Sequence, residues 1–316
     1  MALGNNFLKN LCQWNWQTPI VPRRWLRWLY RREFIRSRAQ GVSLPFECDF
    51  FGFRYAGDIC NTIDFHCFFY GAFEKGHLFF WRDVAQKHFG GQGVFLDIGA
   101  NVGQHSLFMA RHCATVHAFE PFEPVRRKII EKVELNDLTN LIVHTVGLGD
   151  KEQRLPFHPP SGANLGVGSF VDGQQDRCKA TETLQVVNGD EYFSRHIGGE
   201  VHMVKMDVEG FEKKAMAGFG NTFAKNRPVI VVEMTKGLEH SFKSGNDVQC
   251  AFPAEYDLYV FDLAGQDGRK DKRKDAAFRK KGTYRLAPFE FDKVEEQTDV
   301  IGFPRELCMQ NAGVHR

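Results

Sequence analysis

The sequence predicts an α/β fold in which a mostly parallel sheet carries helices on both faces. Between residues 94 and 233, short apolar runs alternate with helical patterns, and most of these runs end in an acidic residue. Such alternation is typical of βαβ units, whose crossovers are right-handed and whose ligands bind beyond the carboxyl ends of the strands. The 316 residues, 43% hydrophobic and 25% charged, suffice for one large or two small domains and exclude a disordered or collagen-like chain.

Charge, cysteine content and hydropathy narrow the class of protein further. A formal net charge of +2 is too balanced for a protein whose whole surface binds nucleic acid. The eight cysteines form no C-x-x-C pair, which favours reduced thiols and a cytoplasmic setting. No apolar stretch reaches the ~18 residues that a membrane-spanning helix needs, and we expect no secretory signal at the N-terminus.

The first 45 residues predict a basic, aromatic helical extension. Trp25, Trp28 and their apolar neighbours can share one helical face with arginines around it, and Pro22 suits the first turn. Such a helix either packs its tryptophans onto the main domain or makes peripheral contact with anionic lipid or a lipid-linked substrate.

Residues 46–92 predict lead-in strands followed by a helix. The run FECDFFGFRYAG alternates like a hairpin. The following run begins a helix near Glu74, and Gly90 and Gly91 end it.

The next segment contains the first two strand–helix units. Residues 94–96 form an apolar run ending at Asp97, followed by a glycine turn and a helical pattern over 104–113. Residues 115–119 form a second strand that ends at Glu120, and a helix is expected over 124–135.

Three more strands are predicted further along the chain. A third strand is expected over 141–146, a fourth over 201–206 ending at Asp207, and a fifth over 229–232 ending at Glu233. A helix is expected over 209–217. The basic run 268–281 is interpreted as a solvated segment or, alternatively, as a contact for a polyanion.

The turn between the first strand and its helix predicts a ligand site. Gly99 and Gly103 allow the backbone to approach a ligand closely, while the absence of G-x-G-x-x-G argues against a pyrophosphate cradle. Glu120, about 20 residues further at the end of the second strand, is placed to bind a ribose diol.

These motifs together resemble the FkbM family of S-adenosylmethionine-dependent methyltransferases. The resemblance spans roughly residues 60–235 and is carried by the runs FLDIGANVG, FEP and KMDVEGFE, with GAFE upstream and a glycine loop over 164–169. It implies a Rossmann-like class I methyltransferase sheet of seven strands. Residues 1–45 and 240–316 lie outside the resemblance. We expect four segments: the extension 1–45, the lead-in 46–92, the cofactor-binding core 93–240, and a C-terminal completion of the sheet over 241–316.

The resemblance also implies where S-adenosylmethionine binds. Its methionine end would be lined by residues of the glycine turn, its ribose would be held by Glu120, and its adenine would lie near Asn136 and the turn that includes Gly149. The residues implied for the methionine end are Asp97, Gly99, Asn101 and Gly103.

The third motif is expected to face the reacting methyl group. Lys205 and Asp207 share a strand face if the strand is regular, and Glu209 and Glu212 share a face if the helix begins at 209. Because the sulfonium methyl is already activated, the enzyme must align the acceptor and take up its proton. Asp207, Glu209 and Lys205 are the expected catalytic or orienting groups. Glu212 is better explained as a helix N-terminal acid, and His105 as a packing histidine, although it can also serve as a base.

The expected reaction is O-methylation of a hydroxyl on a sugar, glycan or secondary metabolite. Alternatives are a nucleic-acid methyltransferase that uses the basic segments for phosphate contact, and a catalytically silent binding module of the same fold. A nucleic-acid partner is not expected, because no N/D-P-P-Y/F motif stands at Asp207. No metal site is predicted, although Asp207 and Glu233 leave magnesium open.

Overall fold

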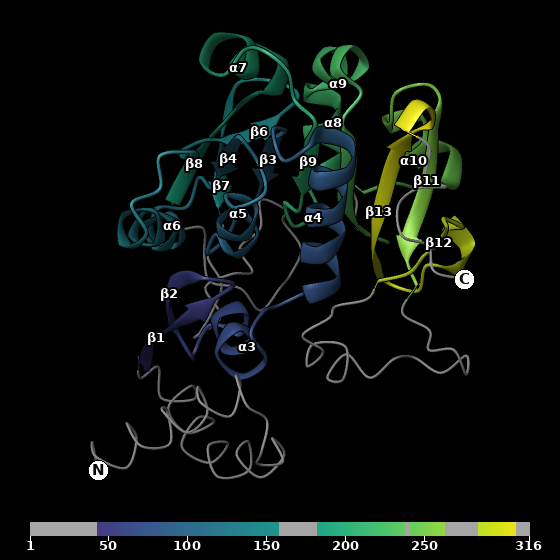
Figure 1. Ribbon diagram of the computed structural model, residues 1–316. Helices are drawn as coiled ribbons and strands as arrows, with labels where there is room; N and C mark the ends of the chain where they lie inside the picture. Colours follow the sequence, from purple (N-terminus) through teal and green to yellow (C-terminus); the bar gives the residue numbers. More distant parts are fainter. Residues whose placement is uncertain (1–42, 158–181, 238–240, 263–283, 308–316) are drawn as a thin grey trace, which may run out of the picture.

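A computed structural model of the chain describes residues 43–157, 182–237, 241–262 and 284–307 (Figure 1). The Arg/Trp-rich segment up to residue 42, the glycine loop 164–169 and the basic run 268–281 lie outside these residues. No helix of the described residues has the length and apolarity needed to cross a membrane. Within the same ranges Cys48, Cys60, Cys67, Cys113 and Cys250 are free thiols.

The main sheet has eight strands in the order β12-β11-β13-β10-β9-β3-β4-β5. The predicted mostly parallel α/β fold is confirmed, since all neighbouring pairs from β5 to β10 are parallel, while β13, β11 and the short added strand β12 pair antiparallel. The bounds are β3 Val94–Ile98, β4 Thr115–Phe119, β5 Leu141–His144, β9 Met203–Met206, β10 Val229–Thr235, β11 Tyr256–Phe261, β12 Leu286–Pro288 and β13 Gln297–Pro304.

The strand order places a switch point at the centre of this sheet. From β3 the chain moves outward through β4 to β5, and it then returns to β9 on the other side of β3. Loops that leave β3 and β9 therefore diverge to opposite faces, and the gap between them is where ligands bind in open α/β sheets.

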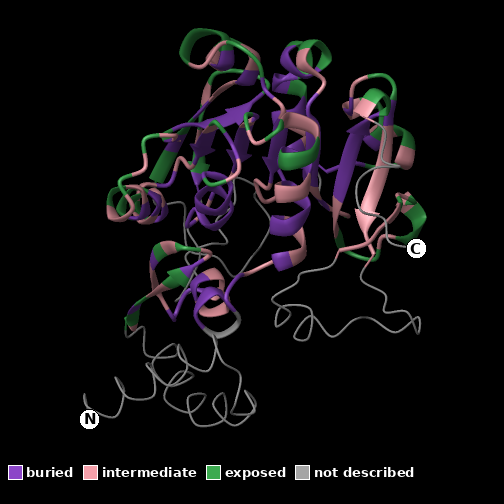
Figure 2. Cartoon of the chain, in the orientation of Figure 1, coloured by how far each residue is buried: buried purple, intermediate pink, exposed green. Residues whose placement is uncertain are grey.

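Helices cover both faces of the sheet, and the alternation of side chains along each strand supplies both cores. Phe95, Met203 and Val231 face the layer containing α3, α4, α5 and α6. Leu96, Val204 and Val232 face the layer containing α7, α8, α9 and α10. Figure 2 shows the strands buried between the two layers. The bounds are α3 Thr62–Tyr70, α4 Lys75–Phe89, α5 Gln104–Met109, α6 Glu123–Leu135, α7 Gly189–His196, α8 Glu212–Gly218, α9 Gly220–Asn226 and α10 Gly245–Ala251, with short 3-10 helices η1 Phe291–Lys293 and η2 Arg305–Leu307.

Local sequence explains several element boundaries. The hairpin of β1 Pro45–Phe50 and β2 Phe53–Asp58 turns at Phe51 and Gly52, which both have positive φ as a two-residue hairpin turn requires. Asn61 caps α3 by accepting hydrogen bonds from the N–H groups of Ile63 and Asp64, and Gly71 ends the helix at φ 84°.

A second, smaller sheet was not foreseen. Strands β6 Gly147–Gly149, β7 Gln153–Phe157 and β8 Glu182–Asn188 form it in the order β6-β8-β7. It packs on α8 so closely that a Cβ on Gly218 would lie 1.9 Å from the carbonyl oxygen of Gly149. This part of the chain lacks the apolar periodicity of the main strands.

Some predicted boundaries were wrong. The helix expected from 209 begins at Glu212, because residues 207–211 form a turn. The helix expected over 104–113 ends at Met109. Strand β10 continues to Thr235, so Glu233 lies within the strand and not after it. Helix α3 was not predicted.

Candidate active site

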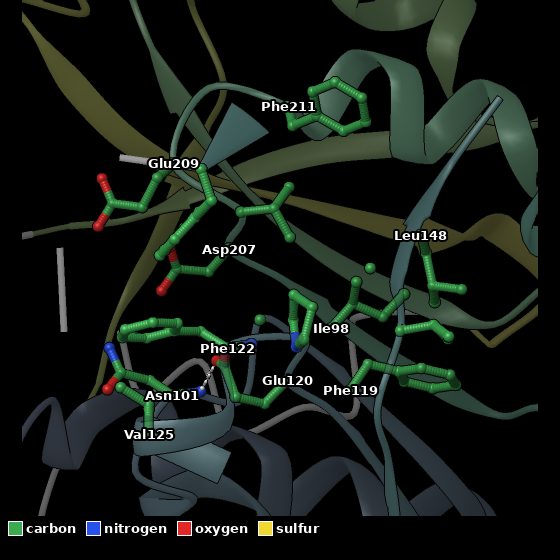
Figure 3. A pocket seen from close by; sticks show the side chains of 16 residues that line it. Ile98, Asn101, Phe119, Glu120, Phe122, Val125, Leu148, Asp207, Glu209 and Phe211 are labelled. Atoms are coloured by element: carbon green, nitrogen blue, oxygen red, sulfur yellow. Dashed lines mark hydrogen bonds between the residues drawn. The ribbon is translucent and has the colours of Figure 1, made fainter. Parts of the chain in front are cut away.

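A pocket opens at the carboxyl ends of β3, β4 and β9 (Figure 3). Its walls combine aromatic and aliphatic side chains with four polar ones. The polar residues are Asn101, Glu120, Asp207 and Glu209; the others are Ile98, Gly99, Phe119, Pro121, Phe122, Val125, Val146, Gly147, Leu148, Phe157, Val208 and Phe211. A largely apolar cleft with a few convergent polar groups is the usual form of a small-molecule site.

Gly99 makes the tight junction between β3 and β9 possible. Its φ is +78°, and a Cβ at this position would lie 1.8 Å from the carbonyl oxygen of Asp207. The N–H of Asp207 donates to the carbonyl oxygen of Ile98 over 3.0 Å, which ties the two strand ends together. Only glycine therefore fits here, and the predicted ligand turn is also a packing constraint.

Glu120 lines the pocket with a carboxylate held by backbone donors. Its Oε2 accepts from the N–H of Asn101 over 3.0 Å, and its Oε1 accepts from the N–H of Phe122 over 3.0 Å. Burial raises the pKa of Glu120 to about 7, against the opposing effect of these two hydrogen bonds. A carboxylate in this setting has lone pairs left for the hydroxyls of a ribose.

Asp97 lies beside the pocket and not in its lining. The carboxyl is fully buried, and the hydroxyl of Ser106 donates to its Oδ2 over 2.5 Å. Its Oδ1 is buried without a hydrogen-bond partner and lies 3.9 Å from the Lys205 ammonium. Burial raises the pKa of Asp97, although Lys205 and Ser106 act in the opposite direction.

Lys205 and Asp207 form an ion pair at the end of β9. The Lys205 Nζ donates to Asp207 Oδ2 over 3.1 Å. Burial opposes the charge on Lys205, but the carboxylates of Asp207, Asp97 and Glu74 outweigh it and raise its pKa. Burial also opposes the charge on Asp207, yet Lys205 and a hydrogen bond with Glu233 hold the pKa of Asp207 below its ordinary value.

Glu233 is a protonated acid next to the Lys205–Asp207 ion pair. Burial and the charges of Asp207 and Asp299 raise the pKa of Glu233 to about 11, so it is protonated at neutral pH and donates to Asp207. Asp207 and Glu233, the two acids considered from the sequence as magnesium ligands, are therefore joined by a hydrogen bond. Asp207 is an ionised carboxylate with a neutral acid on one side and an ammonium on the other.

The turn after β9 separates the two glutamates that were expected to share a helix face. Glu209 has φ +52° and lines the pocket. Glu212 is 3% exposed, and its Oε1 accepts from the N–H groups of Val208 and Gly210, each over 3.0 Å. Glu209 therefore faces the ligand space, while Glu212 holds the turn.

Besides Asp97, three residues implied for the cofactor do not line this pocket. Asn136 follows α6, which runs antiparallel to the strands and so ends at the opposite edge of the sheet; its side chain binds both backbone groups of Arg54 there. Gly149 is buried against Val186 and Phe211, and Gly103 against Ile129. Gly147 and Leu148, two residues earlier than Gly149, supply the pocket wall instead.

The sequence also failed to reveal other parts of this region. The apolar walls Phe122, Val146 and Phe157 carry no motif. His105 is buried, and burial keeps its pKa well below the ordinary value, so its ring is neutral. Its Nε2 faces Glu74, 4.0 Å from Oε2, a proximity that only the packing of α4 on α5 creates.

The amino-acid sequence is similar to parts of several known proteins. The protein AMB antimetabolite synthetase AmbE of Pseudomonas aeruginosa is 33% identical over 175 residues, which cover 44% of this chain and 8% of that protein. Hexuronic acid methyltransferase AglP of Haloferax volcanii is 26% identical over 147 residues, 46% of this chain and 57% of that one. Methyltransferase 1 of Beauveria bassiana is 26% identical over 172 residues, with 48% of this chain and 68% of that protein covered. The chain thus spans a small part of the first relative and just over half of the second.

Among solved structures, methyltransferase FkbM from Methylobacillus flagellatus is 14% identical, with a TM-score of 0.42 over 70% of this chain and 48% of that one. The family model described as the methyltransferase FkbM domain matches residues 97–260, which is just over half of the chain and includes the turn at Gly99, Glu120 and the Lys205–Asp207 pair. The chain belongs to the FkbM methyltransferase family.

Proposed function

We propose that this protein transfers a methyl group from S-adenosylmethionine to a hydroxyl oxygen, with a sugar or glycan as the leading acceptor class and a secondary metabolite as the other. The observation that carries the proposal is the position of Glu120. Its carboxylate lines an apolar pocket at the switch point of the sheet, beside the constrained turn at Gly99 and across from the ionised Asp207.

The residues present fit the cofactor at four points. Glu120 would hold the ribose hydroxyls, and the glycine backbone at Gly99 gives the close approach that the cradle needs. Asp97 Oδ1, buried without a partner, would accept from the amino group at the methionine end. The aromatic and aliphatic walls would enclose the adenine. When bound, the sulfonium supplies an activated methyl group.

The chain's own groups then have to align an alcohol and accept its proton. In such a transfer the hydroxyl proton of the acceptor would move to a carboxylate of the chain. Glu209 and Asp207 both line the pocket and are our candidates for this carboxylate. Lys205 and Glu233 keep Asp207 weakly basic. Its main contribution would therefore be to stabilise the positive charge of the sulfonium and to orient the acceptor hydroxyl, and Glu209 would be the second candidate to accept the hydroxyl proton.

A sugar acceptor is supported by one relative whose name specifies its substrate, the hexuronic acid methyltransferase of Haloferax volcanii. We extend this to sugars joined to lipid, since the Arg/Trp-rich N-terminal segment suits contact with an anionic lipid surface.

The test combines calorimetry with transfer of radiolabelled methyl from S-adenosylmethionine to a panel of hexuronic acids, neutral sugars, lipid-linked sugars and an oligonucleotide. We expect tight binding of the demethylated cofactor product and labelling of a sugar-containing acceptor. Glu120→Ala should weaken cofactor binding at least tenfold, while Asp207→Asn should retain binding and lose turnover. No heat with either cofactor form would overturn the proposal, and labelling of the oligonucleotide alone would move it to nucleic acid.

A further inference from the structure

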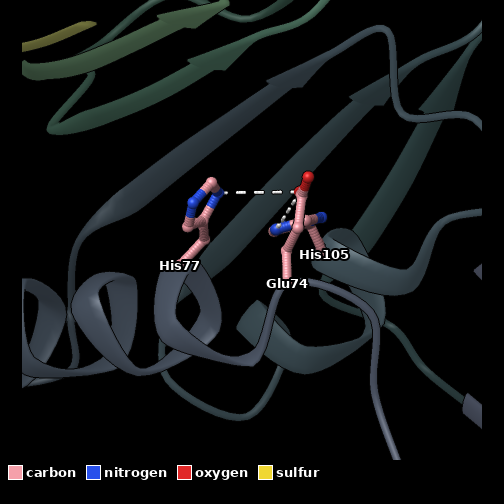
Figure 4. Close-up of side chains that lie close together, drawn as sticks. All are labelled: Glu74, His77 and His105. Carbon is pink, nitrogen blue, oxygen red and sulfur yellow. Dashed lines mark ion pairs between the residues drawn. The ribbon is translucent and has the colours of Figure 1, made fainter. Parts of the chain in front are cut away.

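A second group of ionisable side chains lies outside the pocket, at the starts of helices α4 and α5. Glu74 immediately precedes α4, His77 lies in the first turn of that helix, and His105 lies at the start of α5. Both imidazoles direct a ring nitrogen at the Glu74 carboxylate (Figure 4). Helices α4 and α5 pack against each other, and this packing brings the three residues together.

The spacing within this group is too wide for hydrogen bonds and suits a shared ion. His77 Nδ1 lies 3.6 Å and His105 Nε2 lies 4.0 Å from Glu74 Oε2, and the three ligand atoms all lie within 4.8 Å of one another. Bonds of 2.0–2.1 Å to a central ion place tetrahedral ligands roughly 3.3 Å apart. A cation can therefore be bound if each side chain approaches by less than about 1 Å.

Burial supplies an independent reason for a ligand here. His105 is 7% exposed, and its Nε2 is buried without a hydrogen-bond partner. An unsatisfied buried ring nitrogen carries a free-energy penalty, which coordination would remove. This nitrogen is the one that faces Glu74.

The surroundings of His77 resemble those of a metal-ligating histidine. Its Nε2, the nitrogen away from Glu74, lies 3.7 Å from Asp299 Oδ2 on β13. Its ring stacks on Phe261 of β11 with centroids 3.9 Å apart, which fixes the plane of the imidazole. Histidines bound to metals usually donate their second ring N–H to a carboxylate, which sets the tautomer and orients the ring.

The local charge also favours a cation. The carboxylates of Asp299 and Asp207 lie close enough to act on that of Glu74, and His77 and Lys205 act in the opposite direction. Two imidazoles and one carboxylate suit Zn²⁺, Co²⁺, Ni²⁺ or Mn²⁺ better than magnesium, which prefers oxygen ligands alone.

We infer that Glu74, His77 and His105 form a binding site for a divalent transition-metal ion, with Asp299 as the residue that positions His77. The site differs from the magnesium arrangement considered from the sequence, because it uses neither Asp207 nor Glu233. Its existence does not depend on which acceptor the protein methylates.

The experiment is a Co²⁺ titration of the full-length, chelator-treated protein, followed by visible absorption and then by displacement with Zn²⁺. We expect one equivalent to bind and to be displaced. Glu74→Gln and His105→Ala should each weaken Co²⁺ binding at least tenfold, and Asp299→Asn about tenfold or more. His196→Ala, which removes an exposed histidine of α7, is the matched control and should bind like the wild type.

Binding of the demethylated cofactor and the melting temperature are measured on the same samples, so a failure of the metal site and a failure of the proposed methyl transfer are distinguishable. Glu74 is a third exposed, so Glu74→Gln leaves the packing intact and decides the matter if His105→Ala does not fold. Absence of Co²⁺ binding, or equal affinity in Glu74→Gln and the wild type, overturns the inference.

Discussion

Single residues at the strand ends combine a structural and a ligand-facing role. Glu120 fixes the loop after β4 through two backbone N–H groups and presents its carboxylate to the pocket. Gly99 removes the side chain that would separate β3 from β9. The same residues therefore set both the shape of the pocket and its chemistry, and substitutions must be designed to separate the two.

The first prediction concerns the ionisation of Glu120. With a pKa of about 7, the carboxyl is mostly protonated at pH 6 and mostly ionised at pH 8. Because the ionised form accepts hydrogen bonds from ribose hydroxyls, affinity for the demethylated cofactor should rise up to about tenfold over this interval. Calorimetric titrations at several pH values measure it.

The matched variant for this prediction is Glu120→Gln, which keeps the size of the side chain and does not titrate. It should bind more weakly than the wild type, and its affinity should lack the rise that Glu120 causes. Identical pH profiles for the two proteins would show that another group controls cofactor binding.

The second prediction concerns Gly99. In Gly99→Ala the new Cβ meets the Asp207 carbonyl oxygen at 1.8 Å, so β3 and β9 must separate at their ends. We expect a loss of about 2 kcal/mol or more in the free energy of unfolding, together with loss of cofactor binding. Gly220→Ala is the control: apart from its chain neighbours and the backbone of its own helix, no atom lies within 4 Å of the added Cβ, and in helix α9 alanine should stabilise by about 0.5–1 kcal/mol. Urea unfolding of the two variants gives the comparison.

Among the elements, the turn between β9 and α8 is the one most specialised for its position. Five residues intervene between the last strand residue, Met206, and Glu212, which begins the helix. In that space Asp207 and Glu209 reach the pocket, and Glu209 and Gly210 have positive φ. The buried carboxylate of Glu212 replaces regular backbone pairing by binding two N–H groups of the turn.

The third prediction follows from burial of that carboxylate. Burial raises the pKa of Glu212 from 4.5 to about 7. Because the folded-state pKa lies above the unfolded one, the contribution of Glu212 to stability is greatest below pH 4.5 and is lost as pH rises through 7. Glu212→Gln, which keeps an acceptor for both N–H groups, should gain about 1–3 kcal/mol relative to the wild type between pH 5 and pH 8. Chemical denaturation at both pH values measures the difference, and a pH-independent difference would contradict it.

The strands and helices also show which parts of the site could be predicted from the sequence. The acids at 97, 120 and 207 could be placed along one edge of the sheet because Asp97 lies near the end of its strand and the other two follow theirs, and parallel strands bring their carboxyl ends to one edge. Asn136 was misplaced because the direction of α6 carries it to the other edge. The approach of His105 to Glu74 depends on helix packing, which leaves no signal in local spacing.

At the scale of the whole molecule, the residues that match the family model span a shorter stretch of the chain than the strands of the main sheet do. The match ends at residue 260, within β11, yet β13 at residues 297–304 lies between β10 and β11 in the sheet. The chain therefore reaches the centre of the antiparallel half only near its C-terminus. Val300, Ile301 and Phe303 of that strand are at most 1% exposed and contribute to both cores.

The last prediction is that a fragment ending at residue 262 does not fold, although it contains the whole family match. Removing β13 leaves β10 and β11 without their shared partner, and it removes three buried apolar side chains worth about 1.5–3 kcal/mol each. That loss is comparable to the total stability of ordinary domains, about 5–15 kcal/mol, and the exposed β10 edge invites aggregation. A fragment ending at residue 307 keeps β13 and should unfold cooperatively. Thermal unfolding with and without the demethylated cofactor compares them. A cooperative, cofactor-shifted transition in the shorter fragment would show that the main sheet folds without β12 and β13.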